Sequence, residues 1–404
     1  PFLMMISHYK YLKSGNELYL KLTKTWQKGV AIFFVVGAVS GTMLSFELGL
    51  LWPEFMKYAG PIIGMPFSLE GTAFFVEAIA LGFYLYGWNK IKSKWFHWWT
   101  GVIVGVSGLL SGILVVAANG WMNAPSGFDY IDGKFTNIDP IAALFNDAWF
   151  SQALHMSLAA FIAVGFAVGG LHLWQFYRKK KSPIHFKAFT IALSIASIAA
   201  IVMPLSGDIA AKDIATRQPV KLAAMEAHYE TEKGADLIIG GIVDEEKQTV
   251  SYALHLPKAL SFLAFNDFDA EVKGLNEFPK DEHPPVALTH YSFQIMVGIG
   301  GLLMLLGILF LISIRKKSWR KKKWFLYSFL RATPLGGIAL EAGWFVTELG
   351  RQPWIINGIM KTKDAVTPVE GIQYSFYLYM LIYISLSITV WWLMNRQVKK
   401  LNEL

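Results

Sequence analysis

Long apolar runs, separated by shorter polar connections, constrain this chain more than any other feature. A helical run of about 20 apolar residues matches the hydrocarbon core of a bilayer. After a short apolar stretch at residues 2–6, such runs occur at residues 28–51, 66–88, 98–118, 149–177, 187–206, 290–314, 324–345 and 371–395. Only 16% of the residues are charged, which is less than a soluble domain carries. The sequence therefore predicts an all-α integral membrane protein, a nine-helix transmembrane bundle.

These runs divide the chain into three parts. We expect residues 1–206 to hold a partial first helix and five transmembrane helices, and residues 290–404 to hold three more. Residues 207–289 form one long external loop; at roughly 80 residues it exceeds the usual loop length, which favours a functional loop. The chain begins with Pro1 and its first apolar stretch is too short to span a membrane, so we expect the first helix to be truncated in this sequence.

Basic residues fall on alternate connections between the runs. Clusters at residues 10–28, 90–94, 178–187, 315–323 and 396–400 hold most of the 37 Lys and Arg of a chain whose net charge is +8. The positive-inside rule makes these connections cytoplasmic and the long loop external. A basic chain could instead bind nucleic acid, but the periodic placement of the charge favours membrane topology and predicts no nucleic-acid partner.

Missing residues and motifs exclude several kinds of site. The chain has no cysteine, which excludes disulfides, thiolate metal sites, iron–sulfur clusters and covalent c-type haem attachment. It also lacks a Walker loop, a dinucleotide-binding glycine pattern and a His-Glu-x-x-His motif.

The segment from Glu341 to Trp354 places charge at the edge of an apolar run. Charge at membrane depth is costly and usually marks function. Glu348 and Arg351 are three residues apart and can pair if the helix continues that far. We therefore expect a functional site here.

His155 and Met296 lie about seven residues inside their runs, at matching depth on two helices. An imidazole and a thioether at the same depth could bind a haem iron between the helices. The alternatives are a histidine that is only hydrogen-bonded to a neighbouring helix and a methionine that fills a gap in the core.

Two pairs of charged residues are further candidates. Glu70 and Glu77 are about two turns apart on one face of a helix, which suits a proton relay or an iron ligand, although one interfacial acid and one structural hydrogen bond would also explain them. Lys221 and Glu226 lie in the long loop, on a stretch that predicts a short amphipathic helix at the membrane surface. Either residue alone could be a solvated surface charge.

Taken together, these motifs resemble subunit I of the cytochrome bd quinol oxidases, from about Ser14 onward. The most specific segments are Gly343-Trp-Phe-Val-Thr-Glu-Leu-Gly-Arg-Gln-Pro-Trp354 and Ala118-Asn-Gly-Trp-Met-Asn-Ala-Pro125. The helix with Glu70 and Glu77 and the stretch Lys221-Leu-Ala-Ala-Met-Glu226 are similar too.

The resemblance implies a bacterial or archaeal cell-membrane enzyme that oxidises a membrane quinol at the outer face. It implies that O2 is reduced to water at a high-spin haem pair, electrogenically and without pumping. The expected cofactors are a low-spin haem b, a high-spin haem b, and a haem d or third haem b. The expected partners are subunit II and a small accessory subunit.

The resemblance also implies roles for single residues. His155 and Met296 would be the axial ligands of the low-spin haem b, and Glu348 the axial ligand of the high-spin haem b. Trp344 would lie between the haems and Arg351 would pair with haem propionates. The resemblance assigns proton delivery to Glu70 and Glu77, and quinol oxidation to Lys221 and Glu226.

Two departures from the family pattern matter. The family has a haem-ligand histidine in its first helix; His8 falls at the cytoplasmic end, so this ligand is not in the sequence, and oxygen chemistry would be lost if the chain lacked it. The family commonly has Arg two residues before the ligand methionine, where this chain has Gln294. Loss of that cation should lower the potential of the low-spin haem, which suits menaquinol.

Three other functions were compared with this one. A haem–copper oxidase needs several more membrane histidines than this chain offers. A proton-coupled membrane transporter could use Glu70 and Glu77 without any haem. A haem-containing membrane electron-transfer protein would lack O2 reduction, as the missing first-helix histidine allows.

Overall fold

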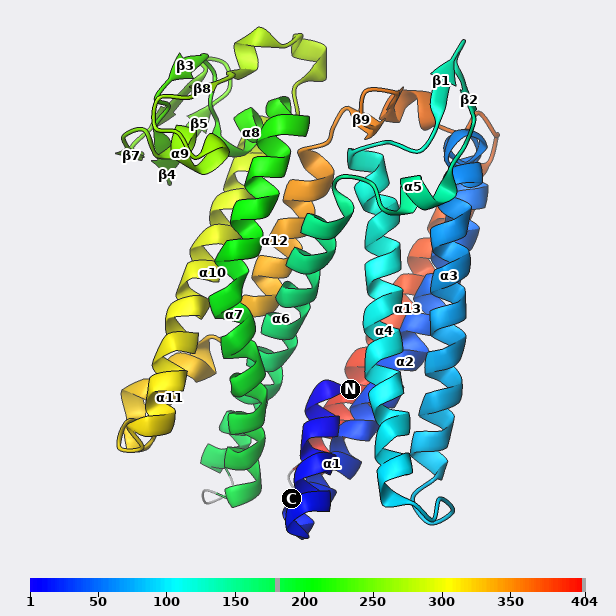
Figure 1. The fold of residues 1–404 in the computed structure, drawn as a ribbon, viewed down its shortest axis with the longest axis vertical. Coiled ribbons are helices and arrows are strands. Elements are labelled where there is room, and N and C mark those ends of the chain that lie inside the picture. Colours follow the sequence, from blue (N-terminus) through cyan, green and yellow to red (C-terminus); the bar gives the residue numbers. More distant parts are fainter. Residues whose placement is uncertain (179–181, 402–404) are drawn as a thin grey trace.

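The computed structural model describes residues 1–178 and 182–401 (Figure 1). Residues 179–181, which belong to the predicted basic cluster at 178–187, and residues 402–404 lie outside the described residues. Long helices run nearly side by side, and most of the non-helical segments form a layer across one end. We call this end the loop side and the opposite end the basic side.

Seven of the described helices are long and apolar enough to cross a membrane. They are α2 (Glu17–Leu51), α3 (Pro53–Tyr86), α4 (Lys94–Asn123), α6 (Trp149–Arg178), α7 (Pro183–Arg217), α10 (Val286–Arg315) and α13 (Ile372–Leu401). The prediction of an all-α membrane protein is confirmed. The count of nine stays a prediction, because α1 (Phe2–Ser14) has 13 residues and α12 (Leu335–Leu349) has 15.

One predicted helix is broken. The prediction of a continuous helix over residues 324–345 is wrong: α11 (Lys323–Arg331) ends before a turn, and α12 begins after Pro334. Proline has no N–H for the helical ladder and disfavours helical geometry at the residue before it. The apolar composition of the run concealed this interruption.

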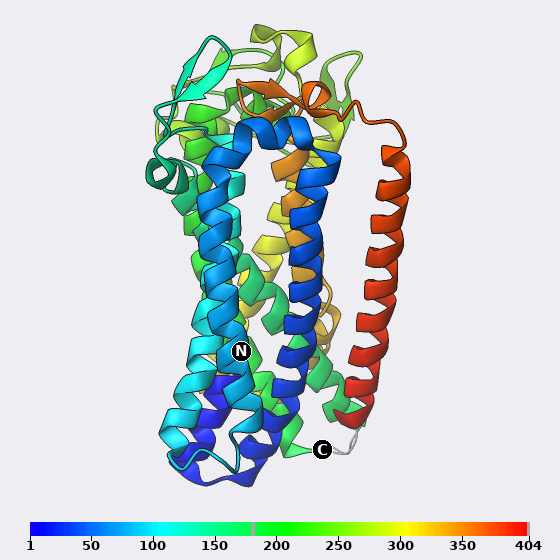
Figure 2. The same cartoon turned by 90° about the vertical axis from the view of Figure 1, so that its right-hand side faces the viewer.

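The main core joins α6, α7, α10 and α11. Phe166, Phe189, Phe310 and Phe329 are fully buried there and pack edge-on or stacked on one another. Small residues allow the helices to approach closely, because a Cβ at Gly165 would lie 2.5 Å from the Cβ of Ala196. α3 packs along α4 in a second group, and α13 packs chiefly on α2 and stands at the edge of the bundle (Figure 2).

The loop side carries the short elements. Within the long loop, two helices accompany three antiparallel pairs of strands, β3–β8, β4–β7 and β5–β6. Their bounds are α8 (Pro219–Glu226), α9 (Ala259–Phe265), β3 (Glu232–Lys233), β4 (Leu237–Ile239), β5 (Ile242–Asp244), β6 (Thr249–Ser251), β7 (Leu254–Leu256) and β8 (Glu271–Val272). The long loop also holds two 3-10 turns, η1 (Leu275–Glu277) and η2 (Lys280–Glu282). Outside it on the loop side are β1 (Asp129–Ile131), β2 (Lys134–Thr136), α5 (Pro140–Leu144), β9 (Trp354–Ile356), β10 (Met360–Lys361) and the 3-10 turn η4 (Thr362–Ala365). A further 3-10 turn, η3 (Trp319–Lys321), connects α10 to α11.

Helices extend into both ends of the segment that the sequence assigned to the long loop. α7 continues to Arg217, and α10 already begins at Val286. The extension of α7 carries two acid-before-base pairs at i,i+4, Asp208–Lys212 and Asp213–Arg217, and such pairs stabilise a helix. The irregular part of the loop is therefore shorter than predicted.

Candidate functional site

The last turn of α12 presents Glu348 to two partners. The Nη2 atom of Arg351 donates to Glu348 Oε2 at 2.6 Å, and Asn119 Nδ2 from α4 donates to Oε1 at 2.8 Å. Glu348 and Arg351 pair as predicted, but not within a continuous helix, because α12 ends at Leu349. The two side chains differ in access, since Arg351 is 3% exposed and Glu348 is 44% exposed. The carboxylate thus has a fixed orientation and one open face.

Arg351 retains unused hydrogen-bond donors. Within residues 1–178 and 182–401, its buried Nε and Nη1 atoms have no hydrogen-bond partner. Buried donors without acceptors are costly, and a guanidinium is well suited to a carboxylate. These atoms therefore fit an additional anionic group, such as a haem propionate. Trp344 lies one turn before Glu348 on the same face of α12 and is 37% exposed, so this face is open over a full turn.

A series of hydrogen bonds between side-chain amides ends at the carboxylate of Glu348. Gln218 donates to Asn123 Oδ1 at 3.3 Å, Asn123 donates to Asn119 Oδ1 at 3.1 Å, and Asn119 donates to Glu348. The sequence analysis gave Asn119 no role, although it lies in one of the specific segments. The available signal was an amide in an apolar helix, where polar groups are expensive.

Lys221 and Glu226 are both buried, with 4% and 3% of their surface exposed. The interpretation of either residue as a solvated surface charge is therefore wrong. α8 begins with Pro219 at its first turn and ends at Ala227 in the left-handed region. It packs against α7 and α10, and Lys221 also contacts Thr347 of α12.

The environment of these two residues changes their ionisation. Burial lowers the pKa of Lys221 to about 7, with a further lowering from Arg351 and an opposing effect from Glu348. Burial raises the pKa of Glu226 to about 8. In the described part of the chain, Glu226 Oε2 is buried without a hydrogen-bond partner. Both groups can therefore gain or lose a proton near neutral pH, as acid–base chemistry requires.

Lys221 also connects α8 to the Glu348 segment. Its Nζ donates to the carbonyl oxygen of Thr347 at 3.2 Å, and its aliphatic stem lies over Gly350. A Cβ at Gly350 would lie 3.0 Å from two carbons of Lys221. The structure thus brings together two candidate sites that are more than 100 residues apart in the sequence.

His155 is held in an orientation suited to metal binding. Its Nδ1 atom is 3.0 Å from Ser206 Oγ on α7, and Ser206 donates its own hydrogen to the carbonyl oxygen of Met203. With its hydrogen on that carbonyl, Ser206 can accept from His155 Nδ1–H, and in this tautomer the lone pair is on Nε2. A hydrogen bond at one ring nitrogen commonly prepares the other as a metal ligand. The sequence analysis did not single out Ser206.

Met296 lies on α10 against α12. A Cβ at Gly343 would be 3.1 Å from Met296 Sδ, so glycine leaves room for the thioether. α6, which carries His155, also packs against α12. The two predicted ligands therefore come from helices that share α12 as a neighbour.

Glu70 and Glu77 both face α4, as their spacing predicts. Ser111 Oγ donates to Glu70 at 2.7 Å. The carboxylate of Glu77 lies against Gly108, where a Cβ would be 3.0 Å from its Oε1. Gly108, Ser111 and Asn119 lie on one side of α4, since 11 residues complete about three turns. α4 thus connects both predicted proton-carrying acids with the Glu348 site.

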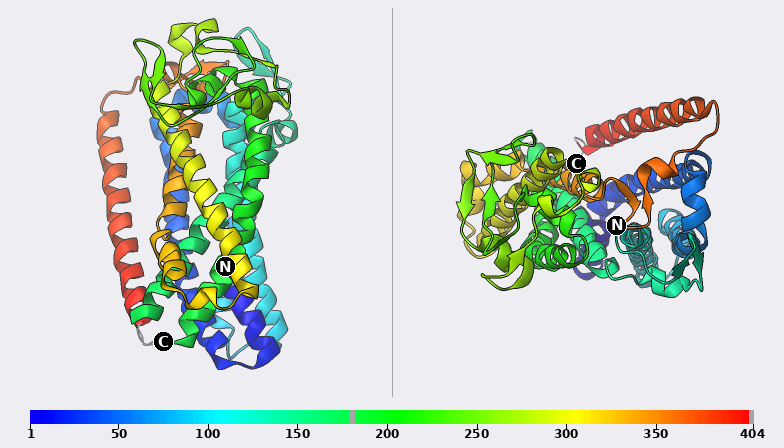
Figure 3. Two further views of the ribbon diagram at one scale, coloured as in Figure 1. Left: turned by 90° about the vertical axis from the view of Figure 1, so that its left-hand side faces the viewer. Right: turned by 90° about the horizontal axis from the view of Figure 1, so that it is seen from above.

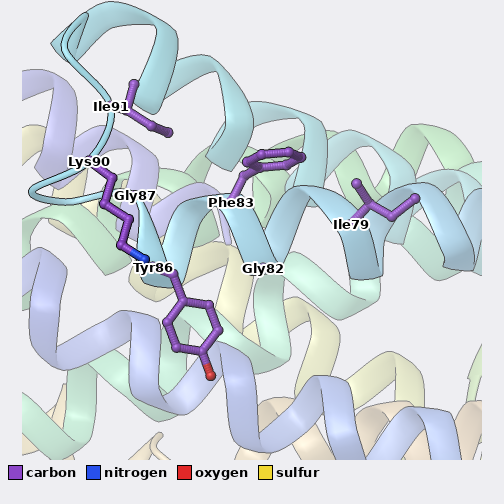
Figure 4. Close-up of a pocket in the computed structure, with 7 residues that line it drawn as sticks. All are labelled: Ile79, Gly82, Phe83, Tyr86, Gly87, Lys90 and Ile91. Atoms are coloured by element: carbon purple, nitrogen blue, oxygen red, sulfur yellow. The ribbon is translucent and has the colours of Figure 1, made fainter.

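A separate apolar groove lies on the outside of α3 near the basic side (Figure 4). It has a volume of about 440 Å³ and is lined mainly by Ile79, Phe83, Tyr86 and Ile91, with Lys90 at its end. It contains none of the predicted site residues. Its lining suits contact with an acyl chain rather than chemistry.

Comparisons with known proteins cover nearly the whole chain. Residues 1–402 match the family model described as cytochrome bd terminal oxidase subunit I. A putative cytochrome bd menaquinol oxidase subunit I of Bacillus subtilis is 36% identical over 96% of this chain and 89% of its own length. Cytochrome bd ubiquinol oxidase subunit 1 of the same organism is 30% identical over 99% of this chain and 88% of its own length. The structure of bd oxidase from Geobacillus thermodenitrificans matches with a TM-score of 0.92 and 37% identity, over 99% of this chain and 92% of that one.

Proposed function

The chain belongs to the cytochrome bd terminal oxidase subunit I family, and we propose that quinol is oxidised on its loop side, beside Lys221 and Glu226. As a member of this family it is a subunit of a respiratory quinol:oxygen oxidoreductase in the bacterial plasma membrane. It works with subunit II and uses haem. Family membership rules out the transporter and haem–copper alternatives.

The single observation that carries the proposal is the contact between α8 and α12. The hydrogen bond from Lys221 to Thr347 places the proposed quinol site directly against the residue before Glu348. Direct contact between the proposed quinol site and the proposed haem-binding segment would favour rapid electron transfer from quinol to haem. An enzyme that links quinol oxidation to oxygen reduction needs such a contact.

Glu226 is the proposed proton acceptor for quinol. A pKa of about 8 lies close to the working pH, which suits a general base, and Oε2 is free of other partners in the described residues. Lys221, with its pKa of about 7, would hold the oxygen of the head group at Nζ. We propose menaquinol as the quinol, because Gln294 supplies no positive charge near Met296 and a relative is named a menaquinol oxidase subunit.

The chemistry of the predicted ligands supports the haem assignments that the family resemblance implies. We assign a low-spin haem b to His155 and Met296 and a high-spin haem b to Glu348, and we propose a haem d or third haem b as the remaining cofactor. When bound, the haems carry electrons and reduce O2 to water. The lone pair on His155 Nε2, the open face of Glu348 and the unused donors of Arg351 support this assignment. Trp344 would line the space between the haems.

Protons for oxygen reduction would arrive from the basic side along α4. Glu77 and Glu70 would pass them past Gly108 and Ser111 toward Glu348. Protons released on the loop side and taken up from the other side separate charge across the membrane. The enzyme would thus be electrogenic without a pump.

Glu226→Gln tests the proposed quinol site in the holoenzyme with subunit II. We expect quinol-driven oxygen consumption to fall by about 10²-fold, the usual contribution of one acid–base group. Oxygen consumption driven by an artificial donor that reduces the haems directly should persist. Glu230→Gln, at an exposed position in the same loop, is the matched control. Normal quinol turnover by Glu226→Gln would contradict the proposal.

A further inference from the structure

The underside of the long loop carries an exposed apolar surface that the proposed function does not use. In the β4–β7 pair, Leu237 is opposite Leu256 and Ile239 is opposite Leu254, so four aliphatic side chains share one face. Leu254 is 60% exposed and Ile239 is 44% exposed. A surface of this kind usually marks contact with a protein or a membrane.

Helix α9 enlarges this surface. Phe262 and Phe265 of α9 are exposed, and the ring of Phe268 stacks on Phe262 at 4.4 Å between centroids. Figure 1 shows α9, β4 and β7 along the lower edge of the loop layer, beside the upper part of α10, and Figure 3 shows the layer from above. The elements that carry the surface therefore lie on the bundle side of the loop layer.

Gln294 fixes the depth of the β4–β7 pair. Its Nε2 donates to the carbonyl oxygen of Ile238 at 2.8 Å, and its Oε1 accepts from Gly240 N at 3.2 Å. Both hydrogen bonds are made eight residues into α10, about 12 Å from its first turn. The strands are thus held well down the side of this helix.

The neighbouring helix α7 shows where the membrane ends. Gly307 of α10 packs against Ser197 of α7, and the two helices are antiparallel, so Gln294 lies level with Ala210. Ala210 is between Asp208 and Lys212, which form the first ion pair after an uncharged stretch of α7 that is long enough to span a bilayer. The β4–β7 pair is therefore held at the boundary between hydrocarbon and head groups.

We propose that this surface, formed by Ile239, Leu254 and Leu256 of the β4–β7 pair and the exposed phenylalanines of α9, rests in the lipid leaflet on the loop side. Its partner is the bilayer, because the surface is apolar, lies at interfacial depth and adjoins a transmembrane helix. Polar contacts beside it include the ion pair of Lys258 with Asp269 and the contact of His255 Nδ1 with Asp236 Oδ2 at 3.7 Å. Gln294 is the residue that positions it.

The absence of cysteine from the sequence allows single nitroxide labels. The Leu254→Cys holoenzyme is labelled with a nitroxide and reconstituted into vesicles of phosphatidylethanolamine and phosphatidylglycerol. The parent enzyme, treated in the same way, gives the signal of any label on subunit II, and this signal is subtracted. Glu246→Cys, at the exposed turn between β5 and β6, is the matched control. We expect the ratio of collisions with oxygen to collisions with a water-soluble nickel chelate to be several-fold higher at position 254.

Equal ratios at both positions would overturn the proposal. So would a label at position 254 that is immobile and inaccessible to both reagents, which would show that a protein covers the surface. If Leu254→Cys does not assemble, Phe262→Cys provides the same comparison from α9. Unchanged haem absorption of each labelled enzyme verifies that the site residues are undisturbed.

Discussion

Helix α4 contacts acidic residues at two levels, and the two levels are built differently. On the loop side, Asn119 donates a hydrogen bond to the carboxylate of Glu348. The guanidinium of Arg351, whose Nη2 lies 2.6 Å from Glu348 Oε2, balances the charge of this carboxylate. In the middle of the helix, Ser111 and Gly108 adjoin Glu70 and Glu77, and among the described residues neither acid forms a salt bridge. A paired carboxylate stays charged and in place, whereas an unpaired one can take up and release a proton. The difference supports our proposal that the first level serves binding and the second serves proton transfer.

The largest effect is expected from Glu348→Ala. Removing the carboxylate would leave the buried guanidinium of Arg351 without its counter-charge. We expect loss of the high-spin haem and a fall in unfolding free energy of about 2 kcal/mol, less than for a fully buried pair because Glu348 is partly exposed. Haem content and thermal unfolding measure this. Glu341→Ala, at an exposed position of the same helix, is the control, and equal haem content in both variants would contradict the binding role.

Glu77→Gln tests the second level. The amide keeps the shape of the side chain but cannot carry a proton, so we expect oxygen consumption to fall by at least about 10-fold. Quinol binding and haem content should stay normal, because the loop-side site is unaltered. Glu54→Gln near the start of the same helix serves as the control. Parent-like oxygen consumption by Glu77→Gln would remove the proposed distinction between the two levels.

The pH dependence of Glu226 gives a smaller effect. Its pKa is raised to about 8, so the folded protein binds a proton that the unfolded chain releases at a lower pH. The contribution of Glu226 to the unfolding free energy is therefore lost as the pH rises from about 4.5 toward 8. In Glu226→Gln, the unfolding free energy should no longer fall over this pH range because of position 226. For catalysis, quinol kcat/KM should increase up to about pH 8 in the parent enzyme. A flat profile in the parent would contradict the role of Glu226 as a base.

Gln294→Arg should have the smallest effect. A cation roughly 10 Å from the iron, at an effective dielectric constant of about 20, would destabilise the oxidised haem relative to the reduced haem by about 1–2 kcal/mol. We therefore expect the potential of the low-spin haem to rise by tens of millivolts. Gln294→Met, which removes the hydrogen bonds to the loop without adding charge, separates the two contributions. A redox titration in which both variants have the same potential would show that charge at this position is unimportant.

The fold could be predicted from the apolar runs because membrane helices must satisfy their backbone internally. The break at Pro334 was missed because the composition of the run remains apolar on both sides of it. The burial of Lys221 and Glu226 could not be predicted, since it depends on how α8 packs against α7 and α10 and on the contact of Lys221 with Thr347 of α12.

The candidate site was only partly visible in the sequence. The i,i+3 spacing of Glu348 and Arg351 predicted their contact correctly. The supporting hydrogen bonds from Asn119 and Ser206 connect helices far apart in the chain, and no local pattern indicates them. The haem-ligand roles of His155, Met296 and Glu348 stay predictions.

The central claim is that the side chains of His155 and Met296 bind the iron of the low-spin haem b. The most direct measurement is a reduced-minus-oxidised absorption spectrum of the His155→Leu holoenzyme beside the parent and His283→Leu, a loop control. The account predicts that the low-spin b band disappears from His155→Leu alone. A low-spin band of normal position and intensity in that variant would contradict it.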